Sequence, residues 1–206
     1  MSGYKVKVLQ PNNWRRYPVG RLDISVGKEK HEGEKFAAAV LWAEQKFSHV
    51  IISVADTLQR FNYMAEGLDK EAAYNLSYKM GTDWIMRNRK YLEGKTIIRW
   101  DERLNHPLYK QYIKRTKQTI NHCKNLRDSI KLEALDYTSR IGSELTSERM
   151  QYLIEEIAVF DMLFKIEPAA DVYPGSILPF WEHKAYESKA AFTRIDFTRR
   201  KKQTAA

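Results

Sequence analysis

Ser25 is the first residue in this sequence whose type and position could support chemistry. It ends the segment RLDIS, and the turn VGK follows it. The hydrophobic pattern predicts a strand over residues 20–26 and a helix over residues 33–47, so the hydroxyl stands where a strand leads into a helix. A serine at such a junction is either a nucleophile or a cap for the helix that follows.

The turn after Ser25 lacks the motifs of common catalytic and nucleotide sites. It contains no G-x-G-x-x-G, no G-x-x-x-x-G-K-[ST] and no G-x-S-x-G, which argues against a dinucleotide site, a phosphate-binding loop and a hydrolase nucleophile elbow. If Ser25 is a nucleophile, its substrate must therefore arrive as a reactive ester, which needs only a weak base. No motif marks a histidine as that base, and we interpret all the histidines as surface or capping residues: His31, His49, His106, His122 and His183.

Tyr152 and Glu156 form a second candidate group. They are spaced i, i+4 in a helix that we predict over residues 147–164, so both side chains project from the same face. A carboxylate on that face can hold an ammonium group and move its proton. The alternative is an amphipathic helix whose glutamate is an ordinary surface residue. Glu155 points elsewhere on this helix and is the natural control.

A strand–helix–strand unit must position Ser25. The segment HVIISVA, residues 49–55, is almost continuously apolar, as buried parallel strands are. With the strand and helix before it, this segment makes a right-handed βαβ unit. Further strands are predicted over residues 95–100 and in DVYPGSI and RIDFTR, and further helices over residues 70–92 and 107–135.

These elements predict one α/β domain over all 206 residues, with a Rossmann-like, mainly parallel sheet flanked by helices. Residues 1–16 and 199–206 are expected to be flexible ends. Ligands of open parallel sheets bind beyond the carboxyl ends of the strands. At that edge we expect Ser25, Asp56 and Asp101, each just after its strand.

The composition predicts a soluble protein with a polyanionic partner. Hydrophobic residues make up 43% of the chain, the formal net charge is +9 and the pI is about 9.5. No apolar run of about 18 residues predicts a membrane span, and no secretory signal is evident. Because Cys123 is the single cysteine, a disulfide framework is excluded, and we expect a reducing, cytoplasmic setting. The charge favours nucleic acid over a basic but inert surface.

Two predicted helices carry stripes of positive charge. In the first, over residues 70–92, the stripe consists of Lys79, Arg87 and Lys90, with Arg89 alongside. In the second, over residues 107–135, lysines recur on a helical period at Lys110, Lys114, Lys117, Lys124 and Lys131. A charge stripe is usually a solvated face, but two of them on a strongly basic chain favour phosphate contacts.

Five motifs in order resemble one family. They are ISVG (24–27), LWAEQKFSHVIISVADT (41–57), YMAEG (63–67), YLIEE (152–156) and VYP (172–174). Together they resemble the tRNA-dependent cyclodipeptide synthases over residues 20–181, a family similar to the catalytic domain of class I tyrosyl- and tryptophanyl-tRNA synthetases. Lys28, three residues after the serine, and the pair Tyr173–Pro174 resemble the Tyr-Pro subfamily.

The resemblance implies an enzyme that takes two aminoacyl-tRNAs and forms a cyclic dipeptide, a 2,5-diketopiperazine. Ser25 would carry the first aminoacyl group, which implies ping-pong kinetics. Glu156 would anchor the α-ammonium group and take part in proton transfer, while Tyr152 would hold the same amine. Tyr173 would orient the Ser25 hydroxyl or assist cyclisation, unless it is a core aromatic. No cofactor and no metal are implied, no membrane is involved, and a monomer is expected.

The resemblance also places the substrate contacts. By positional match, the pocket for the first side chain is lined by Arg21, Asp23, Ser53, Ala55, Asp101 and Val159. Buried charges need partners, so this lining predicts a polar or charged first amino acid, and Asp23 and Asp101 favour a basic one such as His or Arg. Alternatively, Arg21 and Asp23 pair and leave a small neutral pocket. The tRNA would lie on Lys79, Arg87, Arg89 and Lys90.

Two other functions fit the same sequence. A non-catalytic RNA-binding α/β module would use Ser25 as a helix cap and bind tRNA without acyl transfer. Another aminoacyl-tRNA-dependent transferase would form the same acyl-enzyme and pass the amino acid to a separate acceptor. Tyr152 and Glu156 argue against the first alternative, and product analysis distinguishes the second.

Overall fold

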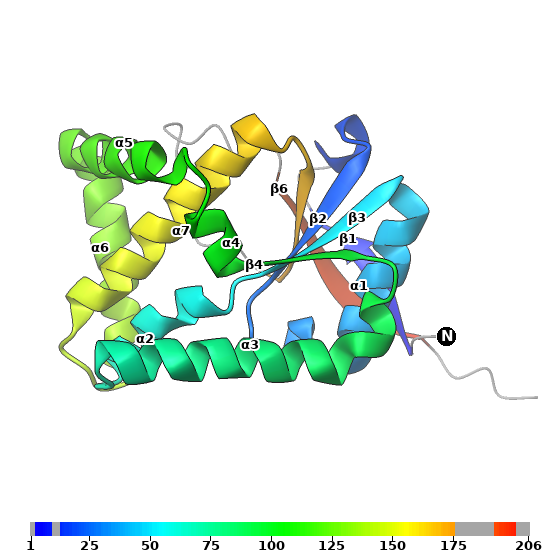
Figure 1. The fold of residues 1–206 in the computed structure, drawn as a ribbon, viewed down its shortest axis with the longest axis horizontal. Coiled ribbons are helices and arrows are strands. Elements are labelled where there is room, and N and C mark those ends of the chain that lie inside the picture. The colour runs from blue at the N-terminus through cyan, green and yellow to red at the C-terminus, as the bar shows by residue number, and fades with distance from the viewer. Residues whose placement is uncertain (1–2, 10–12, 176–191, 201–206) are drawn as a thin grey trace, which may run out of the picture.

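The sheet has six strands in the order β1-β6-β5-β2-β3-β4 (Figure 1). The computed structural model describes residues 3–9, 13–175 and 192–200. All neighbouring strands are parallel except β1, which is antiparallel to β6. The predicted α/β fold with a mainly parallel sheet is confirmed. The strands are β1 (Tyr4–Val8), β2 (Val19–Ile24), β3 (His49–Val54), β4 (Thr96–Arg99), β5 (Ala170–Pro174) and β6 (Phe192–Arg199).

The predicted βαβ unit is formed by β2, α1 (Gly33–Lys46) and β3. Side chains alternate between the two faces of a strand. On β2 this alternation puts apolar side chains on one face and polar side chains on the other. Leu22 and Ile24 join an apolar cluster under α1. Arg21 and Asp23, also buried, carry polar groups on the opposite face. β2 is therefore buried on both faces, and one of the two is charged.

Two long helices lie where the pattern predicts them: α3 (Lys70–Leu92) and α7 (Thr146–Ile166). In Figure 1, α3 runs along the lower edge and α7 crosses the middle of the molecule. Gly81 weakens the helical propensity of α3, but a Cβ atom there would lie 2.4 Å from Asp56 Cβ. The glycine lets α3 approach the loop that follows β3.

The helix predicted over residues 107–135 is wrong, because the chain forms α5 (Tyr109–His122) and α6 (Lys124–Arg140) instead. Cys123 between them has an extended backbone, with φ −108° and ψ 97°. The break lets both helices pack on α7, around a second apolar cluster that includes Ile120, Leu126 and Ile130. Also unpredicted are α2 (Arg60–Ala65), α4 (Trp100–Leu104), and the 3-10 turns η1 (Asn13–Arg16), η2 (Glu29–His31) and η3 (Thr57–Gln59).

The expectation of a flexible end over residues 1–16 is wrong for the described part, because β1 and η1 lie within it. β1 pairs along its length with β6, from Tyr4 opposite Arg199 to Val8 opposite Ile195. At the other end, Arg199 is the last residue of β6, and residues 201–206 lie outside the described residues, as does His183. Within the described ranges, no helix is both long and apolar enough to cross a membrane.

Candidate active site

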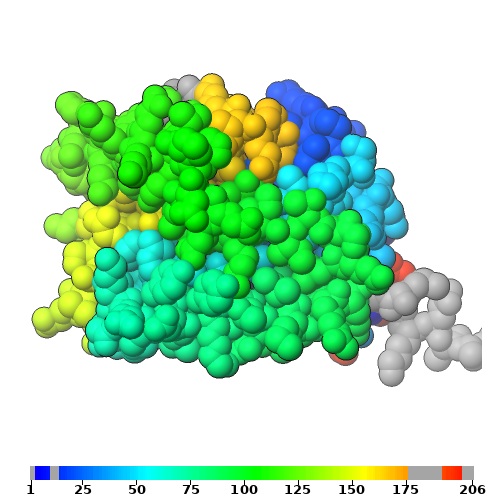
Figure 2. Space-filling view, viewed as in Figure 1, coloured from blue at the N-terminus to red at the C-terminus, as the bar shows by residue number. Residues whose placement is uncertain are grey.

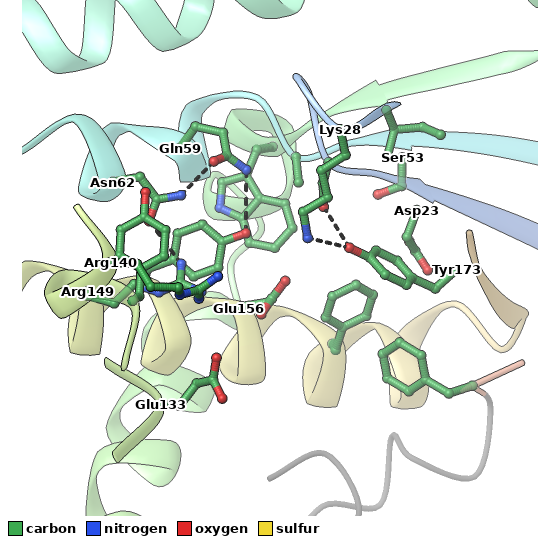
Figure 3. Close-up of a pocket in the computed structure, with 18 residues that line it drawn as sticks. Asp23, Lys28, Ser53, Gln59, Asn62, Glu133, Arg140, Arg149, Glu156 and Tyr173 are labelled. Atoms are coloured by element: carbon green, nitrogen blue, oxygen red, sulfur yellow. Dashed lines mark hydrogen bonds between the residues drawn. The ribbon is translucent and has the colours of Figure 1, made fainter. Parts of the chain in front are cut away.

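A cavity of about 290 Å³ lies where β2, β3 and β5 end, between these strands and α7 (Figure 3). Ligand pockets for small molecules begin at about this size. All four residues that the sequence predicts to be catalytic line it, with three of those predicted for the substrate pocket: Ser25, Tyr152, Glu156 and Tyr173, with Asp23, Ser53 and Ala55. The parallel sheet brings them together because the carboxyl ends of its strands meet at one edge.

Tyr173 lies against the Ser25 hydroxyl. Ser25 Oγ and Tyr173 OH are 3.2 Å apart, and Lys28 Nζ donates a 2.8 Å hydrogen bond to the same phenol oxygen. Gly27 has a φ of 89° and closes a turn in which the Lys28 backbone N–H donates to the Ser25 carbonyl. The turn therefore folds the chain back, so that the Lys28 side chain lies near the Ser25 hydroxyl. Lys28 is a site residue that sequence reasoning used as a subfamily marker without giving it a role.

His31 holds the backbone on both sides of this hydroxyl, so its interpretation as a surface or capping residue is wrong. The Ser25 N–H donates to His31 Nδ1 at 3.1 Å, and His31 Nε2 lies 3.0 Å from the Pro174 carbonyl oxygen. Because Nδ1 accepts, the ring proton is on Nε2 and donates to Pro174. Burial is the main cause that lowers the pKa of His31 to about 3, with the Lys28 charge adding to it. The imidazole is thus a neutral clamp between β2 and β5.

Glu156 projects from α7 into the cavity (Figure 3). Its carboxylate makes no hydrogen bond to any part of the chain that the structure describes. Burial raises its pKa to about 7, although the charges of Arg149 and Lys28 work in the opposite direction. A carboxyl group with this pKa gains or loses a proton near neutrality, as a general acid–base group must.

Tyr152 shares the predicted face of α7 with Glu156 and is held by a chain of polar side chains. Arg149 donates to Asn62 Oδ1 at 2.9 Å, Asn62 to Gln59 Oε1 at 2.7 Å, and Gln59 to the Tyr152 oxygen at 3.4 Å. The Arg149 guanidinium also lies over the Tyr152 ring, 4.1 Å from its centroid. Burial and the charge of Glu156 raise the pKa of Tyr152 well above its usual value, so it keeps its proton.

Gln59, Asn62 and Arg149 also line the cavity, and sequence reasoning missed all three. Gln59 and Asn62 come from η3 and α2, elements that the hydrophobic pattern does not predict. Arg149 lies one turn before Tyr152 on α7, so its i, i+3 spacing to a predicted site residue was the available signal.

Asp23 is a buried carboxyl group in the cavity wall without a hydrogen-bond partner on either oxygen, among the residues described. Burial and the neighbouring carboxylate of Asp171 raise its pKa well above the usual range. Two cations and two anions lie beneath it, with Arg21 bound to Asp171 and Glu167, and Arg103 bound to Glu167. These four charges balance, and Asp23 is the acidic group left over.

Three residues predicted for the substrate pocket lie outside it. Arg21 is fully buried in its ion pairs with Asp171 and Glu167, so the alternative in which it pairs with Asp23 is also wrong. Asp101 accepts hydrogen bonds from Thr57 and Tyr74 instead of facing the cavity. Val159 is buried in the apolar cluster of α7. The positional match predicted the strand or helix on which each residue lies, but it could not predict which partners the side chain contacts.

Glu155 is wrong as an inert control for Glu156, although it does point away from the cavity. It is 6% exposed and accepts hydrogen bonds from Arg60 at 2.6 Å, from the indole of Trp100 at 2.8 Å and from Tyr109 at 3.2 Å. It ties α2, α4 and α5 to α7, so its replacement would disturb the fold.

The four basic residues predicted to bind tRNA on α3 are exposed, and α3 crosses the lower half of the surface shown in Figure 2. They are Lys79, Arg87, Arg89 and Lys90. Lys79 pairs with Asp83, and Arg87 with Glu32, both in solvent-exposed geometry, where a salt bridge contributes little. The predicted second stripe is split between α5 and α6, so its lysines do not form one helical face.

Comparison with solved structures places this architecture. A CDPS (cyclodipeptide synthase) from Fluoribacter dumoffii superposes with a TM-score of 0.83 at 24% identity, covering 96% of this chain and 100% of that one. The chain has the cyclodipeptide synthase fold. A CDPS from Staphylococcus haemolyticus follows with a TM-score of 0.76 at 17% identity, covering 96% and 100% of the two chains. No protein-family model and no curated protein matches the sequence.

A third cyclodipeptide synthase-like structure, from Mycobacterium tuberculosis, has a TM-score of 0.72 at 14% identity and covers 97% of this chain and 94% of that one. It was described as demonstrating that cyclodipeptide synthetases are related to type I tRNA synthetases, which agrees with the Rossmann-like sheet seen here. Among the described residues, no group of three or more His, Cys, Asp or Glu side chains could hold a metal ion.

Proposed function

We propose that this protein is a tRNA-dependent cyclodipeptide synthase of the Tyr-Pro type, which works by ping-pong chemistry through an aminoacyl-Ser25 intermediate. The observation that carries the proposal is the convergence of Ser25, Tyr173, Tyr152 and Glu156 on one cavity within the cyclodipeptide synthase fold. Its Tyr-Pro assignment rests on Lys28 and on the pair Tyr173–Pro174.

In the first step Ser25 Oγ attacks the ester carbonyl of an aminoacyl-tRNA. The bond from Oγ to carbon forms, the bond from carbon to the ribose oxygen breaks, and the serine proton goes to the leaving oxygen. One ester replaces another, so the step needs no ATP. Tyr173 is the side chain in reach of the serine proton, since its oxygen lies 3.2 Å from Oγ.

In the later steps the amine of the bound residue attacks a second aminoacyl-tRNA, and the new terminal amine then attacks the Ser25 ester to close the ring. Each attack requires an amine that has lost a proton. Glu156 can hold the α-ammonium group as a carboxylate and accept its proton, because its pKa of about 7 is close to neutrality. Tyr152 stays protonated and holds the same amine by hydrogen bonding.

In this proposal the first amino acid is basic. The preference for a basic side chain rests on Asp23 alone, because Asp101 does not line the cavity. The ion pairs beneath Asp23 already balance. A cationic side chain entering the cavity would let Asp23 ionise and would give both oxygens a partner, whereas an apolar side chain leaves a buried carboxyl group unpaired.

The tRNA would lie on the exposed basic residues of α3, through phosphate contacts that do not depend on base sequence: Lys79, Arg87, Arg89 and Lys90. Two aminoacyl-tRNAs are the partners in this reaction, and we propose that the enzyme acts as a monomer without cofactor or metal.

The test is product analysis with the purified protein and a full set of aminoacyl-tRNAs. The proposal predicts a diketopiperazine that contains a basic residue, detected by mass spectrometry, and none with Ser25→Ala. Transfer of an amino acid to an added acceptor without ring closure would favour the other transferase. Binding of tRNA without any acyl transfer would favour the RNA-binding module.

A further inference from the structure

Lys28 is the cationic side chain in contact with the Tyr173 hydroxyl, and the steps proposed for Ser25 and Glu156 give it no part. Its ammonium group is 2.8 Å from the phenol oxygen and 5.5 Å from the centroid of the Tyr173 ring. Its backbone belongs to the same turn as Ser25. Three side chains therefore form one hydrogen-bonded chain in the cavity wall, in the order Lys28, Tyr173, Ser25. Figure 3 shows the bond between Lys28 and Tyr173.

The direction of this chain follows from what each group can donate. An ammonium group has donors but no acceptor, so the phenol oxygen of Tyr173 must accept from Lys28. That oxygen has a second lone pair for the Ser25 proton and one proton of its own to give. The arrangement is therefore suited to a relay, in which Tyr173 receives one proton while it releases another.

Building on the proposed function, we propose that Lys28 is a positioning residue that makes Tyr173 the proton relay of the acylation step. The Ser25 proton passes to the Tyr173 oxygen as Oγ bonds to the ester carbon, and the Tyr173 proton passes to the departing ribose oxygen. Tyr173 ends the step as it began. Lys28 stays protonated throughout and stabilises the negative charge that develops on the phenol oxygen in the transition state.

The turn and the His31 clamp support this role. Gly27 fixes the fold-back of Lys28, while His31 fixes the Ser25 N–H and the carbonyl of Pro174, the residue after Tyr173. The ends of the hydrogen-bonded chain are thereby held from the backbone, which is how a preorganised charge lowers a barrier without reorganisation. Lys28 is exposed, so its replacement leaves no buried gap.

The alternative role for an exposed lysine is a phosphate contact with tRNA, and kinetics distinguish the two. We would measure Ser25 acylation by a basic aminoacyl-tRNA under single-turnover conditions, by acid quench and intact mass, over a range of protein concentrations. Lys28→Met should lower the maximal rate by about 10- to 100-fold. Lys28→Arg, which keeps the charge, should retain more of the rate than Lys28→Met.

Lys30→Met is the matched control, because Lys30 belongs to the same segment but pairs with Asp196. It should acylate like the wild type. A double-mutant cycle supplies a readout that a loss of net charge would not move: Lys28→Met should have almost no further effect in a Tyr173→Phe protein, since the two residues act as a unit.

An unchanged maximal rate in Lys28→Met, or a change confined to the half-saturating concentration, would overturn the inference and leave the proposed function standing. The inference would also be overturned if the rate losses of Lys28→Met and Tyr173→Phe multiply in the double mutant, or if Lys28→Arg and Lys28→Met acylate at equal rates. Absence of any acyl-enzyme in the wild type would instead overturn the proposed function and this inference together.

Discussion

The backbone N–H of Ser25 donates to His31 Nδ1 at 3.1 Å, and the opposite nitrogen of the same ring lies 3.0 Å from the carbonyl oxygen of Pro174. One imidazole thus links the end of β2 to the end of β5. Ser25 is one of the two linked residues, and Tyr173 directly precedes the other. These are the two side chains proposed to carry out acylation.

Replacing His31 with Phe should destabilise the protein and slow acylation. The Ser25 N–H and the Pro174 carbonyl would both lose a partner in a buried site, at a cost of about 1–3 kcal/mol for an unsatisfied group. Urea unfolding at pH 7.5 measures the change. Wild-type stability in His31→Phe would show that the imidazole does not hold the two strands.

The same residue predicts a pH dependence of stability. The pKa of His31 is about 3 in the folded protein, against an ordinary value of 6.5, so the unfolded chain binds a proton first as the pH falls. The stabilisation is present above pH 6.5 and is lost as the pH falls toward 3, by at most about 1.4 kcal/mol per pH unit. Between pH 6.5 and 4.5, the free energy of unfolding should fall more steeply in the wild type than in His31→Phe. Parallel slopes would contradict a neutral His31.

Glu156 predicts the opposite trend. Its pKa is about 7 in the folded protein, against an ordinary value of 4.5, so the unfolded chain loses the proton first as the pH rises. Stability contributed by the protonated carboxyl group is present below pH 4.5 and is lost as the pH rises through 7. Glu156→Gln should therefore gain stability over the wild type at pH 8, by about 1–3 kcal/mol, and little at pH 4.5. Denaturant titrations at the two pH values test this, and an equal difference at both would contradict the shifted pKa.

Asp23→Asn should keep the fold and alter the choice of first amino acid. The substitution removes a buried acidic group whose oxygens have no hydrogen-bond partner among the described residues, and it leaves the ion pairs of Arg21 and Arg103 intact. We expect the rate of acylation by basic aminoacyl-tRNAs to fall by about tenfold or more, and acylation by neutral polar ones to rise relative to it. An unchanged preference would show that Asp23 does not contact the side chain.

Asp171→Asn is the contrasting variant for Asp23. It removes one of the two carboxylate partners of Arg21, whose side chain is fully buried, and breaking a buried pair costs about 3–5 kcal/mol. Thermal unfolding should therefore separate the two substitutions, with Asp171→Asn clearly less stable than Asp23→Asn.

The basic surface of α3 predicts a salt-dependent affinity for tRNA. Replacing Arg87, Arg89 and Lys90 together with Gln should weaken binding. It should also lower the slope of log affinity against log salt by roughly 0.7–0.9 for each tRNA phosphate that the variant no longer neutralises. The matched control is the triple replacement of Lys110, Lys114 and Lys117 on α5. Equally weakened binding in both variants would mean that net charge, not α3, governs affinity.

Local pattern was enough to predict the strands and helices that frame the site. Apolar residues at helical spacing predicted α1 and a continuous apolar run predicted β3, because burial in the core dictates these patterns. The break at Cys123 escaped prediction because no Gly or Pro marks it, although Asn121, His122 and Asn125 around it are weak helix formers. Both helices that flank the break pack on α7. Short elements such as α2 have too few residues to show a period.

Site residues could be predicted where their role depends on residue type and on spacing along the chain. Prediction failed where a side chain's partner depends on which distant strands pair. Ser25, Tyr152, Glu156 and Tyr173 all line the cavity, as the resemblance implies. The ion pair of Arg21 with Asp171 follows from the pairing of β2 with β5, 150 residues later in the chain. Nothing near Arg21 in sequence distinguishes Asp171 from Asp23 as its partner.

Trapping the acyl-enzyme tests whether Ser25 receives an amino acid from tRNA, on which the proposed function depends. The wild type would be mixed with an excess of a basic aminoacyl-tRNA, quenched in acid and analysed by intact and peptide mass spectrometry. We expect a mass increase of one aminoacyl residue, located on Ser25 and absent from Ser25→Ala, which should keep the wild-type unfolding temperature. A cyclic dipeptide formed by folded Ser25→Ala, or an adduct on another residue, would refute the role of Ser25.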